Sequence, residues 1–215
     1  MPTEATSRTL RDEQLEVTRN RVLDAVAELI ASDGVFDFTV QQVADRAGVS
    51  HRTIYRHFPD RTALLDALSG RLDVIMTDQL GVPSMASEEF DPVKGIDATW
   101  RLFEDQATLM EALVIASVGT GASLPVRRRR TEDLRANIQD ALDHLDPATA
   151  EAVMAVIRTL GSSTTWFAVR RDHDVDMQEA RRATVWAMAT LLADLRAGGG
   201  PVTTTSDQSS EGDSR

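Results

Sequence analysis

Four arginines and two histidines lie within one short stretch, QQVADRAGVSHRTIYRHFPDR, at residues 41–61. The arginines are Arg46, Arg52, Arg56 and Arg61. Guanidinium groups donate paired hydrogen bonds to phosphates and to guanine edges, so such a cluster is suited to nucleic acid. Residues 46–61 carry a net charge of +3 within a chain of net charge −11, which leaves −14 for the remainder. Because DNA repels an acidic surface, contact is expected through this stretch alone.

Other chemistries find little support in the sequence. There is no cysteine, the four histidines are scattered, and no glycine-rich phosphate loop is present, so we predict no enzyme, no catalytic residue and no cofactor. Asp172, His173, Asp174 and Asp176 have the side chains of metal ligands but not the spacing of a known site, which favours a polar loop and no metal.

A second arginine run, Arg127–Arg130, begins a predicted helix. Glu132 and Asp133 follow four residues after Arg128 and Arg129, where opposite charges on a helix pair. A solvated face is the favoured interpretation, and a second nucleic-acid contact or an acidic effector site is the alternative.

Apolar residues recur at helical spacing along most of the chain, and no stretch of useful length alternates like a β-strand. The sequence predicts an all-α fold of about nine helices, at residues 14–32, 40–47, 51–58, 61–80, 92–104, 105–117, 125–144, 147–170 and 176–196. Residues 1–13 are expected to form a flexible arm, and the Gly/Ser/Thr-rich residues 198–215 a disordered tail.

Two short predicted helices are joined by a tight turn around Gly48, which suggests a helix-turn-helix. Thr39 and Ser50 are suited to cap the two helices, and Asp60 to cap the next one. If Ile54 faces inward together with Phe58, then Arg52 and Arg56 face outward, because successive helical residues turn by about 100°. The alternative is a solvated basic face on an ordinary helical hairpin.

The stretch TVQQVADRAGVSHRTIYRHFPDRTALL resembles the DNA-binding segment of TetR-type transcriptional regulators. The similarity covers roughly residues 18–66, and beyond it the chain agrees with the family in length and helix number. The resemblance implies a helix-turn-helix domain at 14–62 and a helical effector-binding and dimerisation domain at 63–197. It also implies a homodimer, a palindromic double-stranded DNA operator, and a small-molecule effector that releases a repressor from DNA.

The same resemblance assigns roles to individual residues. It implies phosphate contacts for the residues at the starts of the second and fourth helices and on the recognition helix, and base contacts for the first residues of the recognition helix. The DNA-binding residues expected are Thr39, Gln42, Ser50, His51, Arg52, Thr53, Tyr55, Arg56, His57 and Arg61. Arg52 is the candidate for a bidentate contact to guanine. His57 has the alternative of bridging helices, and Tyr55 that of lying partly in the core.

The C-terminal half offers two apolar sets. Candidates for an effector pocket are Trp100, Phe103, Met110, Leu113, Met154 and Trp166; the alternative is that they fill a packed core. Candidates for a dimer interface on the last helices are Val153, Ile157, Leu160, Val185, Met188, Leu192 and Leu195; the alternative is packing within one protomer.

Composition fits a cytoplasmic DNA-binding protein. Apolar residues make up 42% of the chain and charged residues 27%, as in ordinary globular proteins. No apolar run approaches the ~20 residues that span a bilayer, and the first residues lack the apolar segment of a signal peptide. The rival functions are a helical adaptor that docks an acidic protein on its basic patch, and a helical enzyme without a recognisable motif.

Overall fold

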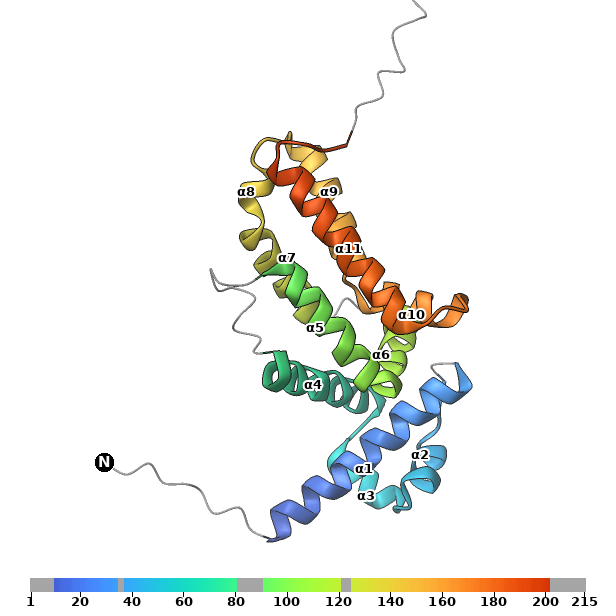
Figure 1. Ribbon diagram of the computed structural model, residues 1–215. Coiled ribbons are helices and arrows are strands. Elements are labelled where there is room, and N and C mark those ends of the chain that lie inside the picture. The colour runs from blue at the N-terminus through green and yellow to red at the C-terminus, as the bar shows by residue number, and fades with distance from the viewer. Residues whose placement is uncertain (1–9, 35–36, 81–90, 121–124, 202–215) are drawn as a thin grey trace, which may run out of the picture.

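The computed structural model describes residues 10–34, 37–80, 91–120 and 125–201 of the chain. These residues form eleven α-helices and no strand, which confirms the predicted all-α class (Figure 1). The helices are α1 (Leu10–Asp33), α2 (Val40–Ala47), α3 (His51–His57), α4 (Arg61–Leu80), α5 (Pro92–Asp105), α6 (Ala107–Thr120), α7 (Pro125–Asn137), α8 (Gln139–Leu142), α9 (Pro147–Leu160), α10 (Ser163–Asp172) and α11 (Met177–Arg196).

Two long predicted helices are each divided in the structure. The stretch 125–144 breaks at Ile138, which leaves the helical conformation (φ −119°, ψ 15°) and is fully buried. The stretch 147–170 ends its first helix at Gly161, and Ser162 caps the next one by accepting a hydrogen bond from the amide of Thr165. The apolar spacing continues across both breaks, so periodicity alone did not reveal them.

The predicted ends of the chain are described only in part. α1 begins at Leu10, so the last four residues of the predicted arm are helical, and residues 1–9 lie outside the described residues. Of the predicted disordered tail, residues 202–215 lie outside the described residues. None of the helices in the described part of the chain combines the length and the hydropathy of a membrane span.

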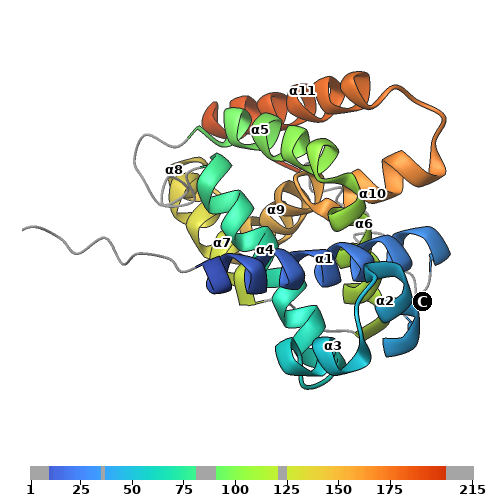
Figure 2. The ribbon, with the colours of Figure 1, turned by 90° about the horizontal axis from the view of Figure 1, so that it is seen from below.

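α1 joins the N-terminal helices to the rest of the molecule. Its buried face, from Val22 to Ile30, packs on α2, α4 and α6, and its most extensive contact is with α6. Figure 2 shows α1 lying between the α2–α3 pair and the C-terminal helices. A displacement of α6 would therefore reach α2 and α3 through α1.

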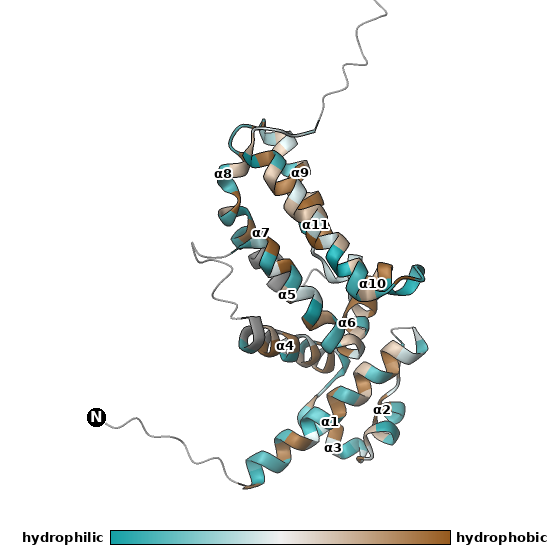
Figure 3. Cartoon of the chain, in the orientation of Figure 1, coloured by the Kyte–Doolittle hydropathy of each residue, from teal (hydrophilic) through white to brown (hydrophobic). Residues whose placement is uncertain are grey.

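The C-terminal helices pack around a core that is continuous with that of the N-terminal helices. α11 packs along α5 and also contacts α8 and α9, while α10 contacts α5, α6 and α9. Polar and apolar residues alternate in bands along α1 and α11, as expected of amphipathic helices with one face in the core (Figure 3).

Candidate nucleic-acid interface

A reciprocal capping box fixes the start of α2. The amide of Gln42 donates to the hydroxyl of Thr39 at 3.2 Å, and the amide of Thr39 donates to the side-chain oxygen of Gln42 at 2.8 Å. Each side chain thereby satisfies an amide that the first helical turn leaves unpaired. The predicted cap at Thr39 is confirmed, and both residues lie exposed at the end of the helix.

The turn between α2 and α3 depends on Gly48. Its φ of 63° is in the left-handed region, where a side chain adds strain, and the amide of Val49 donates to the carbonyl of Ala44 at 3.1 Å. Ser50 then accepts a hydrogen bond from the amide of Thr53 at 3.1 Å and caps α3. The predicted helix-turn-helix is thus present, with both of its predicted boundary residues in their roles.

The inward and outward faces of α3 are those that the sequence predicts. Ile54 and Phe58 are buried, 1% and 2% exposed, and hold the helix against the core of α1 and α2. Arg52 and Arg56 are exposed. Tyr55 is 53% exposed, so the alternative that it belongs to the core is not supported. The remaining predicted base-reading residues, Ser50, His51 and Thr53, lie at the first turn of α3.

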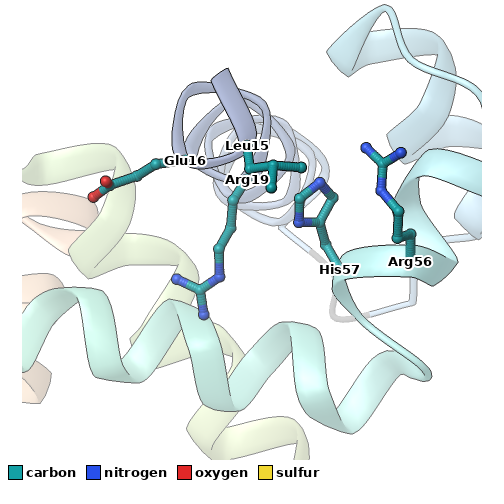
Figure 4. Close-up of a pocket in the computed structure, with 5 residues that line it drawn as sticks. All are labelled: Leu15, Glu16, Arg19, Arg56 and His57. Atoms are coloured by element: carbon teal, nitrogen blue, oxygen red, sulfur yellow. The ribbon is translucent and has the colours of Figure 1, made fainter. Parts of the chain in front are cut away.

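His57, at the end of α3, is half-buried beside an open groove of about 400 Å³ (Figure 4). The groove is lined by Leu15, Glu16, Arg19, Arg56 and His57. Burial of the ring lowers the pKa of His57, and the positive charges of Arg56 and then Arg19 lower it further. Its buried Nε2 atom has no hydrogen-bond partner among the described residues.

Two of the basic residues are partly engaged within the domain. Arg61 pairs with Asp37 at 3.1 Å and lies over the ring of Phe38, 4.5 Å from its centroid. Arg46 pairs with Glu28 at 3.6 Å. Arg61 therefore ties the start of α4 to the segment before α2, a structural role that the sequence did not reveal because the partners are 24 positions apart.

The six candidates for an effector pocket are all buried in the continuous core, as the alternative interpretation had it. The rings of Phe103 and Trp166 lie 5.8 Å apart, and the indole nitrogen of Trp166 donates to the carboxylate of Glu104. The indole nitrogen of Trp100 has no hydrogen-bond partner among the described residues. A ligand cavity among these residues remains a prediction.

A cluster of charges lies beside Trp166. Arg170 on α10 pairs with Glu104 on α5 at 3.0 Å and with Glu111 on α6 at 2.8 Å. Its guanidinium group also lies 5.7 Å from the centre of the Trp166 ring. This cluster links three helices of the C-terminal half, and one of them, α6, packs on α1.

The residues predicted for the dimer interface lie mostly in the core of the protomer. Ile157, Met188, Leu192 and Leu195 are at most 3% exposed, because the apolar stripes to which they belong face the core of their own protomer. Val153, Leu160 and Val185 are half-buried and also pack against that core. Four of the seven residues are therefore not exposed in the protomer, and the other three are exposed in part; their place in a dimer interface remains a prediction.

Different residues stand on the outer faces of α9 and α11. The large apolar side chains exposed there are Val156 at 54%, Trp186 at 70% and Leu191 at 37%. Trp186 is flanked at helical spacing by the exposed small residues Ala183 and Thr190. An unexplained tryptophan outside the main apolar stripe was the signal in the sequence that could have identified this face.

Two further charged clusters were singled out in the sequence, at residues 172–176 and 127–130. Asp172, Asp174 and Asp176 are exposed, and Asp176 caps α11 by accepting from the amides of Gln178 and Glu179. Among the described residues, no group of three or more His, Asp or Glu side chains could hold a metal ion. The side chains of Arg127–Arg130 lie outside the described residues.

Comparisons with known proteins agree with this geometry. Residues 22–68 match the family described as "Bacterial regulatory proteins, tetR family". The chain is 31% identical over 87 residues to the HTH-type transcriptional regulator SrpR of Pseudomonas putida, covering 40% of this chain and 36% of that protein. It is 31% identical over 83 residues to the uncharacterized HTH-type transcriptional regulator TtgW of the same species, covering 39% of this chain and 54% of that protein. The chain thus spans between a third and about half of these relatives.

Solved structures extend the likeness to the whole fold. A TetR-like transcriptional regulator from Rhodococcus sp. RHA1 has a TM-score of 0.61 at 13% identity, covering 85% of this chain and 97% of that one. The TetR family regulator PfmR from Thermus thermophilus has a TM-score of 0.56 at 20% identity, covering 81% and 95%. At such identities the likeness shows the fold. The match at residues 22–68 and this likeness therefore show that the N-terminal helices are similar to the tetR family and that the chain shares the fold of these TetR-type structures.

Proposed function

We propose that the protein is a homodimeric transcriptional regulator that reads a palindromic DNA operator and is released from it by a small-molecule effector. The observation that carries the proposal is the recognition helix α3, capped at Ser50 and anchored by Ile54 and Phe58, which presents Arg52 and Arg56 outward on an otherwise acidic chain. A helix of about two turns fits the ~12 Å major groove of B-DNA.

Within this proposal some residues of α2, α3 and the start of α4 contact bases and the others contact phosphates. Arg52 donates to guanine O6 and N7, with Ser50, His51 and Thr53 contacting neighbouring base edges. Tyr55 contacts a phosphate, as do Arg56 and His57. Thr39 and Gln42 present the start of α2 to the backbone, where helix amide groups and their partial positive charge favour phosphate. Arg61 adds a phosphate contact from the α4 start, held in position by Asp37.

The outer faces of α9 and α11 are the proposed dimer surface, in place of the buried stripes. Trp186 is the central residue, because a large aromatic side chain at 70% exposure is costly in water and typical of interface centres. Its small neighbours on α11 allow a partner helix to approach closely. Val156 on α9 and Leu191 on α11 are the other large apolar side chains exposed on these two helices, which contact each other.

Effector control would act through α6. A ligand entering the core near Trp100, Phe103 and Trp166 would displace α5, α6 or α10, which meet at the Arg170 cluster. Because α6 packs extensively on α1, such a movement shifts α3 relative to the α3 of the partner subunit. The spacing of two half-sites is fixed by DNA, so a changed separation of the recognition helices weakens binding.

The test is DNA binding by matched arginine variants. Arg52→Ala should lose ~1–3 kcal/mol of discrimination against an operator altered at the contacted guanine. Arg196→Ala removes an equal charge from the end of α11, which lies far from α3 (Figure 1), and should leave binding unchanged. Fluorescence anisotropy with the operator and a scrambled duplex measures both. Equal affinities of the wild-type protein for the two duplexes would refute sequence-specific recognition.

A further inference from the structure

The groove at the end of α3 lies partly outside the helix-turn-helix. Two of its walls are the last turn of α3, with Arg56 and His57, and the first half of α1, with Leu15, Glu16 and Arg19. Arg19 stands three residues before the segment that matches the family, and it is not among the residues predicted to contact DNA. Figure 4 shows the side chains of Arg19 and Arg56 on either side of the His57 ring.

Positive charge converges on this groove. Burial of the ring is the main cause of the lowered pKa of His57, and the positive charges of Arg56 and then Arg19 lower it further. Glu16 is the one acidic residue lining the groove. Arg19 and Arg56 flank the His57 ring, and an anion bound between two positive charges is attracted by both.

The groove also has unsatisfied hydrogen-bonding capacity and room for a ligand. The Nε2 atom of His57 is buried and has no partner among the described residues, so a small turn of the ring is required before that nitrogen can donate to a phosphate oxygen. The volume of about 400 Å³ is many times the ~30 Å³ of a water molecule, so a phosphate group fits with its solvent. The groove is open at the surface, so a polymer backbone can reach it.

We propose that Arg19, Arg56 and His57 form a binding site for one backbone phosphate of duplex DNA, with Arg19 as a contact supplied by α1. The inference rests on the proposed DNA-binding function and deepens it, because it adds a contact from α1 to those proposed for α2, α3 and the start of α4. Arg19 is held for this role by Phe58, whose ring centroid lies 5.4 Å from its guanidinium carbon.

This contact would have a consequence for regulation. α1 packs more extensively on α6 than on any other helix, so a phosphate held by α1 connects the DNA backbone to the helix next to the C-terminal core. Movement of α6 would then act on the DNA through Arg19 as well as through the spacing of α3. The effector would loosen backbone contact and base reading together.

The experiment compares Arg19→Gln and Arg19→Lys with Arg21→Gln, a control of equal charge change on the same helix. Arg21 is exposed and lies two residues from Arg19, about 200° around the helix axis. Dissociation constants are measured from about 50 to 250 mM salt on operator and random duplexes. Each lost phosphate contact reduces the slope of log K against log salt by about 0.9, and both protomers of the proposed dimer carry the change, so the slope should fall by about 1.8.

The expected result is that Arg19→Gln shows this reduced slope and binds both duplexes more weakly by the same factor. Arg19→Lys and Arg21→Gln should keep the wild-type slope. Thermal unfolding of each variant confirms that it remains folded. An Arg19→Gln slope equal to that of the wild type would overturn the inference alone. A folded wild-type protein that bound no duplex would instead refute the proposed function.

Free phosphate is the other source of the same chemistry. The wild-type protein is titrated with inorganic phosphate at constant ionic strength, and binding is followed by the NMR resonances of the His57 ring. The resonances should shift only weakly and without saturation up to about 10 mM phosphate, on the order of the weakest biological affinities. Saturation well below about 1 mM, on the order of a specific small-ligand site, would mean that the groove binds a soluble phosphate compound and would overturn the assignment to DNA.

Discussion

Replacement of Trp186 by alanine should dissociate the dimer without unfolding the protomer. Trp186 is 70% exposed, and an indole side chain offers up to ~250 Å², so a partner subunit could bury about 170 Å² of it. At ~25 cal/mol per Å² this burial contributes about 4 kcal/mol for each copy. Interface truncations retain part of that contact, so we expect a loss of about 2 kcal/mol per copy. With two copies in a symmetric dimer, the dissociation constant should rise about 1,000-fold.

Met188→Ala provides the matched control on the same helix. Met188 is 3% exposed in the protomer core, so its truncation leaves a cavity and should lower the free energy of unfolding by ~2–5 kcal/mol. Sedimentation equilibrium at micromolar concentration measures dimerisation, and urea unfolding at one fixed protein concentration measures stability. Trp186→Ala remaining dimeric with an unchanged dissociation constant would refute the assignment of this face.

Three further outcomes are expected. Gly48→Ala should cost ~1–2 kcal/mol of stability in urea unfolding, because the left-handed backbone strains any side chain although the space beside it is empty. Arg170→Ala should cost about 1–2 kcal/mol by leaving Glu104 and Glu111 part-buried without this partner, whereas exposed Arg171→Ala should cost about 0.5 or less. His57 has a pKa below its ordinary 6.5 in the fold, so the unfolded chain binds more protons and stability falls as pH drops below about 6.5. Urea unfolding at about pH 7.5 and 5.5 measures this change, and the free energy of unfolding should fall less between the two pH values in His57→Gln than in the wild-type protein.

The helix-turn-helix was predictable in detail because local chemistry determines it. Thr39 and Ser50 act as caps through side chains that reach amides three residues away, and Gly48 supplies a backbone conformation that other residues adopt only with strain. Once Ile54 is placed in the core, helical geometry fixes Arg52 on the opposite side. Such interactions span a few residues, so the sequence contains them directly.

The C-terminal half was less predictable because its interactions join distant segments. Apolar residues occur on more than one side of α11, so helical spacing alone does not identify its inner face. Packing against α5 determines that Met188 faces inward and Trp186 outward. Arg61 pairs with Asp37, and Arg170 with Glu104, 66 positions away. The groove containing Arg19 likewise depends on where α1 crosses the end of α3, which no local pattern specifies.

The most direct test of the account is selection of binding sites from a random duplex library with the purified protein at about 150 mM salt. Two copies of α3 related by a two-fold axis predict an enriched palindrome whose half-sites are separated by about one helical turn or a multiple of it. The Arg52→Ala variant, selected in parallel, should lose the preference for guanine at one position in each half-site. A folded, dimeric protein that enriched no sequence would contradict the assignment of α3 as a recognition helix.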